Sequence, residues 1–290
     1  MTRILFLVLA LCGPAQLASA QSSTLSGRVA LGYTDDLSGT AIGAVDLTWS
    51  LAVTRRQPLR FEIGTYLFAL DGKRPHETYA AFAWNDSWRL GVVRPAYDGV
   101  LPSGFERLAP YHAYERAEYA RAFTTVEAMR RTAVPWGASY EGVSGPLSFA
   151  ISVHDAVKGS FRSGTVAVEY AGAGWSLAAA VEGARSRGGQ HRDTNSKIGA
   201  RFDVAGGAVG IAYLHPELNN RDNALALDMT LPLGDRLTLM GAAELTELHR
   251  DDAYALGMDV RLRDTLSVLV SGSDTTARGS AAHLTLETRF

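Results

Sequence analysis

Residues 254–262 read YALGMDVRL, and this short stretch decides the fold class. Its apolar side chains stand at every second position from Tyr254 to Leu262, whereas Asp259 and Arg261 fall on the positions between them. Alternation with a period of two is typical of a β-strand that has one apolar and one polar face. The same alternation recurs along most of the chain, so the sequence predicts an all-β protein.

About sixteen segments carry this alternation, and within each of them every charged side chain falls on the polar positions. A lipid-facing Arg or Lys costs roughly 2–4 kcal/mol at the bilayer midplane, which explains such a strict partition. No segment after the leader is long and apolar enough for a membrane helix, so a membrane protein here has to be a closed barrel. We therefore predict a transmembrane antiparallel β-barrel of about sixteen strands; a secreted β-sandwich with one buried face is the alternative. The segments are 25–33, 45–53, 59–67, 79–84, 88–92, 136–141, 147–153, 166–170, 175–182, 197–204, 209–213, 225–231, 237–244, 254–262, 266–270 and 282–290.

The first twenty residues are typical of a secretory leader. Arg3 provides the positive start, residues 4–11 the apolar core, and residues 18–20, ASA, a cleavage site of small residues. We expect the mature protein to begin at Gln21 and to form one barrel domain over residues 21–290. The apolar core is far shorter than the roughly 20 residues that span a bilayer, which argues against an uncleaved anchor.

Composition excludes some partners and one source of stability. The formal net charge of −2 becomes −3 once Arg3 leaves with the leader, so the chain has no basic excess to neutralise a nucleic-acid backbone. The one cysteine of the chain, Cys12, lies in the leader, so disulfides cannot stabilise residues 21–290. With 47% hydrophobic and 20% charged residues, the composition by itself is that of an ordinary globular protein, and the alternation carries the fold prediction.

The connections between the predicted strands alternate in length. Those after even-numbered strands are short turns, such as 85–86 and 206–207, whereas those after odd-numbered strands are longer and more polar, such as 155–163 and 184–194. Short turns at one end and long loops at the other are typical of outer-membrane barrels. Both chain ends then lie on the side of the short turns.

Residues 94–135 form the longest interval without strand alternation, and they read RPAYDGVLPSGFERLAPYHAYERAEYARAFTTVEAMRRTAVP. The interval is rich in tyrosine and in charges of both signs. A connection this long is uncommon and usually functional. We expect it to fold into the barrel and to narrow a water-filled pore.

Together these features resemble the general porins of Gram-negative outer membranes over the whole mature chain. The resemblance rests on the leader, the sixteen segments, the longest loop after the fifth strand and the terminal Phe290 on the apolar parity. It implies an outer-membrane homotrimer whose third outer loop folds inward as a constriction. It also implies that Phe290 is the signal read by the barrel-assembly machinery.

The resemblance further implies that acids on the loop face bases on the wall, with Glu115 and Glu118 opposite Arg28 and Arg60. Three loop arginines depart from the family's pattern and make this separation of charge less clean. The expected constriction residues on the loop are Asp98, Glu106, Arg107, Glu115, Arg116, Glu118 and Arg121. The expected pore-wall residues, all on the lumen parity of their strands, are Arg28, Asp46, Arg60, Glu62 and Arg89.

The predicted function is passive diffusion of small hydrophilic solutes and ions, with outer-membrane lipid and the assembly machinery as partners and no nucleic acid. Acids outnumber bases on the polar strand positions, which favours cations weakly. No cofactor is expected, because the seven histidines are scattered without metal-ligand spacing; bound calcium stays open. A structural or adhesin-type barrel plugged by its loop is an alternative. A barrel enzyme is less favoured, since no histidine stands in a recognisable nucleophile motif.

Overall fold

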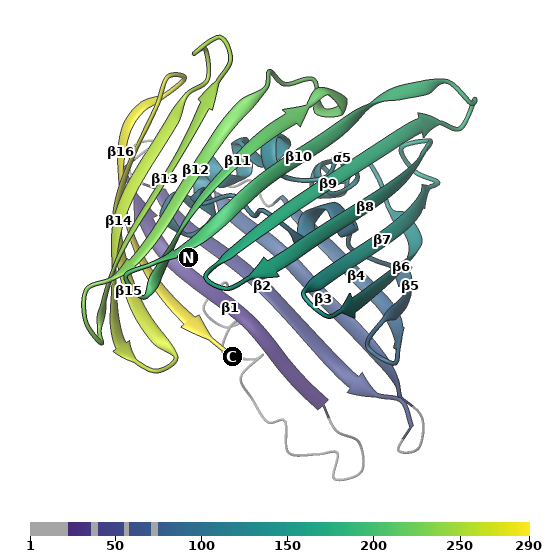
Figure 1. Ribbon diagram of the computed structural model, residues 1–290, viewed down its shortest axis with the longest axis horizontal. Coiled ribbons are helices and arrows are strands. Elements are labelled where there is room, and N and C mark those ends of the chain that lie inside the picture. Colours follow the sequence, from purple (N-terminus) through teal and green to yellow (C-terminus); the bar gives the residue numbers. More distant parts are fainter. Residues whose placement is uncertain (1–22, 36–39, 55–57, 71–74) are drawn as a thin grey trace.

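A computed structural model describes residues 23–35, 40–54, 58–70 and 75–290, and in this part of the chain sixteen antiparallel strands form one closed barrel (Figure 1). Each strand pairs with its neighbours in the sequence, and β1 pairs with β16 to close the ring. The predicted barrel and its strand number are therefore confirmed. The predicted leader, residues 1–20, and the expected mature start at Gln21 lie outside the described residues.

The strands follow one another in the order of the chain. They are β1 (Ser23–Thr34), β2 (Thr40–Ala52), β3 (Leu59–Leu70), β4 (His76–Trp84), β5 (Trp88–Val92), β6 (Pro135–Ser144), β7 (Leu147–Ala156), β8 (Phe161–Gly172), β9 (Trp175–Ser186), β10 (His191–Val204), β11 (Gly207–Pro216), β12 (Ala224–Pro232), β13 (Leu237–Thr246), β14 (Ala253–Arg263), β15 (Leu266–Thr275) and β16 (Gly279–Arg289).

The apolar parity of the strands faces outward, as the alternation predicts. Leu256 is 56% exposed and Val166 52% exposed, whereas Ala255 and Thr165, their neighbours on the other parity, are buried. A soluble protein does not leave a belt of large apolar side chains in water around its whole circumference. The belt therefore belongs against lipid, and the opposite parity lines the interior.

Two loops at one end are shorter than the sequence predicts, so the predicted bounds 155–163 and 184–194 are wrong. Only residues 157–160 connect β7 with β8, and only 187–190 connect β9 with β10. The strands continue because ladder hydrogen bonds join backbone groups whatever the side chains are, so polar residues such as Asp155 and Arg162 remain paired. Polar side chains above the apolar belt made these strand ends look like loops.

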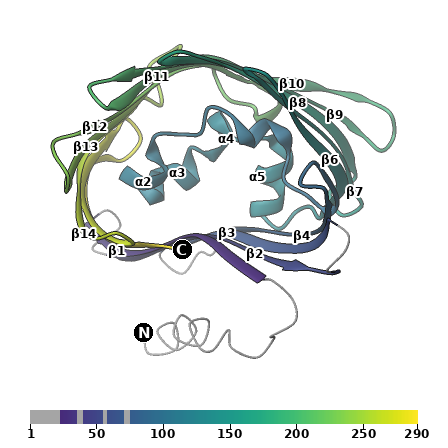
Figure 2. The same ribbon diagram turned by 60° about the horizontal axis from the view of Figure 1, so that its bottom comes forward.

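Helices lie between β5 and β6, in the interval where the alternation stops. They are the 3₁₀ helix η2 (Ala96–Gly99) and the α-helices α2 (Phe105–Leu108), α3 (Pro110–Glu115), α4 (Ala117–Ala120) and α5 (Phe123–Met129); a further 3₁₀ helix, η3 (Glu217–Asn219), follows β11. Within the described ranges, no helix has the length and apolar character needed to cross a bilayer. Figure 2 shows α2 to α5 enclosed by the ring of strands.

A pair of adjacent positions on β12 tests the register. Leu227→Arg puts a guanidinium group on the outward face and should prevent most of the protein from inserting, because the cost is roughly 2–4 kcal/mol at mid-belt. Ala226→Arg faces the interior and should insert normally. The fraction of heat-modifiable protein on gels measures insertion, and equal behaviour of the two variants would show that the register is wrong.

Ala255 on β14 has the same inward parity but is not a suitable control. It is 7% exposed and belongs to a cluster with Phe105 and Leu108 of the helical segment. An arginine there would overpack this contact. From the sequence alone Ala255 and Ala226 are equivalent inward positions. Both pack near the helical segment, but Ala226 is only half-buried and borders the narrow inner hollow, whereas Ala255 is enclosed.

Candidate functional site

The helical segment, residues 93–134, touches strands on several sides of the barrel. Helix α2 contacts β13, β14 and β15, α3 contacts β2 and β3, and α4 contacts β11. On the remaining side α5 contacts β4, and η2 contacts β7, β8 and β9. A segment with contacts on opposite walls of a closed ring crosses its interior, as Figure 2 shows.

Two acids hold the start of α5. Asp98 of η2 accepts hydrogen bonds from the Ala122 amide at 2.7 Å and from the Thr125 hydroxyl at 2.5 Å. Glu182 of β9 accepts from the amides of Phe123 at 2.5 Å and Thr124 at 3.1 Å. The first amides of a helix have no partner within the helix, so these carboxylates satisfy them and fix α5 to the wall. Asp98 thus holds the segment together.

Apolar contacts fix the other half of the segment. Phe105 and Leu108 of α2 are each 1% exposed and belong to one buried cluster with Tyr66, Phe68 and Met240 of the strands. The Tyr66 and Phe68 rings meet edge to face with centroids 4.9 Å apart. Burying a side chain of the size of Phe or Leu contributes about 1.5–3 kcal/mol, so α2 is attached firmly to this wall.

Loop arginines meet wall acids. Arg107 donates to Asp259 at 2.8 Å and to Glu287 at 3.1 Å, and Arg116 donates to Glu244 at 2.5 Å. Burial alone would lower the pKa of Arg107, but the charges and hydrogen bonds of Glu287 and Asp259 outweigh burial and raise it. The arginine therefore stays charged. Here bases on the segment face acids on the wall, which is the reverse of the arrangement that the resemblance implies.

Arg28 is the predicted wall base that does meet a loop acid. Its guanidinium lies 3.8 Å from a Glu106 carboxylate oxygen and 3.4 Å from one of Glu287. Glu106 in turn accepts from Arg121 at 2.5 Å, and the Arg121 guanidinium lies 4.0 Å above the centre of the Tyr66 ring. These groups form one chain of alternating charge from the wall to the segment.

The expected gap between Glu115 and Glu118 on one side and Arg28 and Arg60 on the other is not formed. Glu115 accepts two hydrogen bonds from Arg278, at 2.5 and 2.8 Å. Glu118 pairs with Arg221 and Arg130. Both acids point toward the ends of the odd-numbered strands, because α3 and α4 lie against that end of the barrel, and the register of a distant loop cannot be read from strand parity.

The remaining predicted wall residues lie toward the other end. Arg60 and Arg89 both donate to Glu62, at 3.2 and 3.0 Å. Asp46 accepts from Arg94 at 2.8 Å, a residue at the start of the interval that the sequence reasoning did not single out. Arg60 and Arg89 therefore pair among wall groups rather than with the helices.

Sequence reasoning also missed several residues that hold the segment. Those on strands share lumen parity, which predicts that they face inward but not that they touch a helix. Arg221, Asp251 and Arg278 lie in connections between strands, where parity gives no signal. Lys197 of β10, for example, donates to the Ala120 carbonyl at 2.8 Å. The set comprises Tyr66, Glu77, Glu182, Lys197, Arg221, Glu244, Asp251, Asp259, Arg278 and Glu287.

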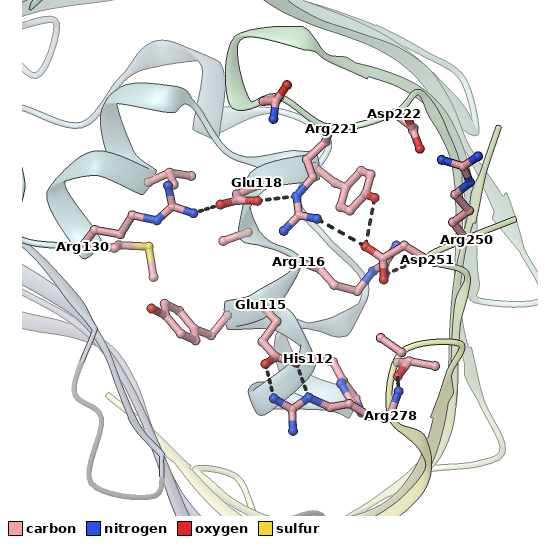
Figure 3. Close-up of a pocket in the computed structure, with 18 residues that line it drawn as sticks. His112, Glu115, Arg116, Glu118, Arg130, Arg221, Asp222, Arg250, Asp251 and Arg278 are labelled. Atoms are coloured by element: carbon pink, nitrogen blue, oxygen red, sulfur yellow. Dashed lines mark hydrogen bonds and ion pairs between the residues drawn. The ribbon is translucent and has the colours of Figure 1, made fainter. Parts of the chain in front are cut away.

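A hollow of about 800 Å³ opens on the side of the odd-numbered loops (Figure 3). Charged residues of both signs surround it, with Arg116 and Tyr119 of the segment both bound to Asp251. Its arginines are Arg116, Arg130, Arg221, Arg250 and Arg278, and its acids are Glu115, Glu118, Asp222 and Asp251.

A hollow of about 850 Å³ opens on the side of the short turns, and its lining is acidic. A narrower one of about 130 Å³ lies beside it and shares Gly99, Val100, Pro102 and Glu169 with it. Neither shares a described lining residue with the hollow at the other end. The charged lining of the larger one comprises Asp46, Asp86, Asp98, Glu106, Glu141 and Glu169 against Arg94 and Arg121.

The described side chains form no cluster suited to a metal ion. Over residues 23–35, 40–54, 58–70 and 75–290, no group of three or more His, Cys, Asp or Glu residues could hold a metal ion. His154 lies 3.5 Å from the Ser163 hydroxyl, but its other ring nitrogen lies 3.2 Å from the Val93 carbonyl rather than beside a carboxylate. This arrangement lacks the third group of a hydrolytic triad.

The architecture is that of the sixteen-stranded porins. Two engineered variants of the porin of Rhodopseudomonas blastica superpose on the chain with a TM-score of 0.70 each, at 16% and 15% identity. In both cases the match covers 93% of this chain and 100% of the other. At this identity the likeness concerns the fold. No protein-family profile matches the sequence, and no curated protein matches it.

The ion pair between Arg116 and Glu244 gives a direct test of how the segment is held. Arg116→Met leaves Glu244, which is 1% exposed, without its countercharge; removing one partner of a buried pair costs roughly 3–5 kcal/mol. We expect the amides of α3 and α4 to exchange hydrogen much faster in this variant. Hydrogen exchange followed by mass spectrometry is the measurement.

Two controls accompany this test. The double variant Arg116→Met with Glu244→Leu removes both charges and should recover most of the protection. Arg278→Met breaks the more exposed pair with Glu115 and should have a small effect, since exposed pairs contribute about 0–1 kcal/mol. Unchanged exchange in Arg116→Met would mean that apolar contacts alone hold α3 and α4.

Proposed function

We propose that the protein is an outer-membrane channel for passive diffusion of small hydrophilic solutes and ions. The observation that carries the proposal is the polar interior of a closed sixteen-stranded barrel, crossed by a helical segment with a large charged hollow on each side. Water-filled barrels of this strand number pass solutes, and the residues at the narrowest level set their selectivity. The segment 93–134 forms that level.

The constriction residues we propose are charged groups that join the segment to the wall; two of them, Glu106 and Arg121, also line the hollow on the short-turn side. Arg107, Arg121 and Glu106 on the segment, with Arg28 and Glu287 on the wall, form a connected charged group. Asp98, Glu115, Arg116 and Glu118 take part by holding the segment in place. Asp46, Arg60, Glu62 and Arg89 line the approach from the short-turn side.

The proposed preference of the channel for cations follows from the negative charge at the approach on the short-turn side. Six acids and two arginines line the larger hollow on the short-turn side, whereas the hollow at the other end has five arginines and four acids. A surplus of negative charge in a confined mouth concentrates cations there. The preference we propose is therefore for cations, in the direction that the strand composition favours.

A plugged barrel is the second candidate, and one observation favours it. The hollows at the two ends share no described lining residue, and the segment between them touches strands on several sides. A barrel closed in this way would serve as a structural or adhesive protein. An enzyme has weaker support, because the described His154–Ser163 pair lacks a carboxylate.

The proposed assembly with copies of the chain follows from the short strand β5, where the barrel wall is lower than elsewhere. Strand β5 has 5 residues, whereas a tilted strand needs roughly 9–11 to cross the bilayer. Its outward aromatic residues Trp88 and, on β4, Phe82 and Trp84 are exposed. We propose that neighbouring copies cover this stretch in a homotrimer.

Phe290 fits the proposed assembly signal. It lies on the outward parity directly after β16, is 50% exposed, and donates its amide to the Gly27 carbonyl at 3.0 Å. A terminal aromatic ring placed outside the closing strand is accessible to the assembly machinery before β16 meets β1. Export through a cleaved leader completes the proposed route to the outer membrane.

Excision of part of the segment tests the constriction. Replacing residues 102–121 by a short Gly/Ser linker removes α2, α3 and α4 but keeps α5 and its cap Asp98. Single-channel conductance in a planar bilayer should rise, because water replaces the helices at the narrowest level. Heat-modifiable migration controls for folding.

The same recordings separate the two candidate functions. A wild-type protein that conducts, with larger steps after excision, supports the channel. A silent wild type that conducts only after excision supports the plugged barrel. Equal conductance of both proteins would place the segment outside the conduction path and overturn the proposed constriction.

Charge substitutions on the short-turn side test the cation preference. In a salt gradient the wild type should show a cation-selective reversal potential, which Arg60→Glu increases and Glu169→Gln decreases. Glu247→Gln, on the opposite end outside the hollows, serves as a control and should leave the potential unchanged. A clear anion preference of the wild type would contradict the proposal.

A further inference from the structure

Charged side chains form a row on the outer face of the barrel, above the apolar belt on β7, β8 and β9. Asp155 stands opposite Arg162 in the ladder, and Arg162 stands opposite Arg185. All three have the outward parity, which in the middle of these strands carries Ile151, Val166 and Val181. The row thus lies at the level where the apolar belt ends.

Positive charge dominates this row. Asp155 is shared, since Arg162 donates to it at 3.3 Å and Arg187 pairs with it as well. Arg162 and Arg185 face each other directly, an arrangement of like charges that is destabilising in an antiparallel ladder. Counting the described side chains of residues 155–162 and 185–193, the bases are Lys158, Arg162, Arg185 and Arg187, and the acids are Asp155 and Asp193.

A hollow of about 390 Å³ lies between the row and the apolar belt. Its outward-facing lining consists of Val153, Arg162, Gly164, Gly183 and Arg185. The two glycines are ladder partners directly below the two arginines. The guanidinium groups therefore stand over a bare patch of strand backbone.

Neither glycine is required by the backbone or by close packing. A Cβ at Gly164 would meet one atom, the Ser152 carbonyl oxygen at 3.9 Å, and a Cβ at Gly183 would meet one atom of Thr194 at 4.0 Å. Neither residue has the positive φ that favours glycine. Glycine inside a strand weakens it and often marks a place where a ligand lies close to the backbone.

We propose that this face binds a phosphate-bearing lipid of the surrounding leaflet. The lipid phosphate lies between Arg162 and Arg185 and relieves their repulsion, and the first part of an acyl chain lies over Gly164 and Gly183. The chain then continues along Val166 and Val181, which are 52% and 50% exposed. Arginine suits this role because its planar guanidinium binds phosphate through two hydrogen bonds. The inference rests on the proposed function in that it needs the barrel to sit in a membrane.

Native mass spectrometry of the full-length protein in detergent, titrated with phosphatidic acid, tests this site. The wild type should bind phosphatidic acid about tenfold or more tightly than phosphatidylcholine, in which choline neutralises the phosphate. The double variant Arg162→Ser with Arg185→Ser should lose about that factor. Gly183→Val keeps both arginines but fills the hollow, and it should lose a comparable factor.

Controls separate the lipid from other sources of the signal. Arg236→Ser, at an exposed turn on the opposite end, should bind phosphatidic acid like the wild type. Inorganic phosphate at the same concentration should not compete; full competition would mean that the site binds free phosphate. Unchanged lipid binding in both the double variant and Gly183→Val would overturn the proposal. Channel conductance of the double variant should equal that of the wild type, so a silent wild type counts against the proposed function alone.

Discussion

Closure of the backbone ladder between β1 and β16 is the constraint on which the rest of the structure depends. Seven register pairs, from Arg28 opposite Arg289 to Thr34 opposite His283, join the first and last strands. A sheet in lipid cannot leave an edge of unpaired amides and carbonyls, so the ring has to close. Closure then fixes which parity of every strand faces inward, and with it the chemistry of the interior.

Inward parity places charged side chains of the wall in buried positions inside the barrel, and groups of the helical segment pair with them. Glu182, Glu244 and Glu287 are each at most 2% exposed on the lumen face, and each is bound by a group of the segment. A buried charge is costly unless it is paired and hydrogen-bonded. Wall and segment are therefore complementary: the acids need the loop arginines and helix amides, and the segment needs the acids to stay across the lumen.

The sequence was sufficient for the barrel because strand alternation reports a local property, the environment on each side of the wall. Strand number, parity and the position of the longest connection all follow from it. The same signal ended too early at Asp155 and Arg162, where the ladder continues above the belt. Beyond the lipid, the outward positions of a strand need not be apolar. A polar strand end then has the same kind of sequence as a loop.

The site could be predicted only in part, because partners in it are joined by tertiary position. The interval 94–135 was identified, and Glu106 does lie near Arg28. Arg107 and Arg116, treated as a departure from the family's pattern, carry the main contacts to the wall. Glu115 and Glu118 face other arginines, since helices between two strands can turn either way and nothing in the local sequence fixes the choice.

In the channel we propose, water and ions pass the helical segment through the interior, and modification of single cysteines tests this most directly. Residues 21–290 contain no cysteine, so Ala226→Cys and Leu227→Cys each introduce one thiol, the first beside the narrow inner hollow and the second on the outward face. A charged, membrane-impermeant thiol reagent should reduce the single-channel conductance of Ala226→Cys and leave that of Leu227→Cys unchanged. A conducting Ala226→Cys channel that the reagent does not affect would contradict the account.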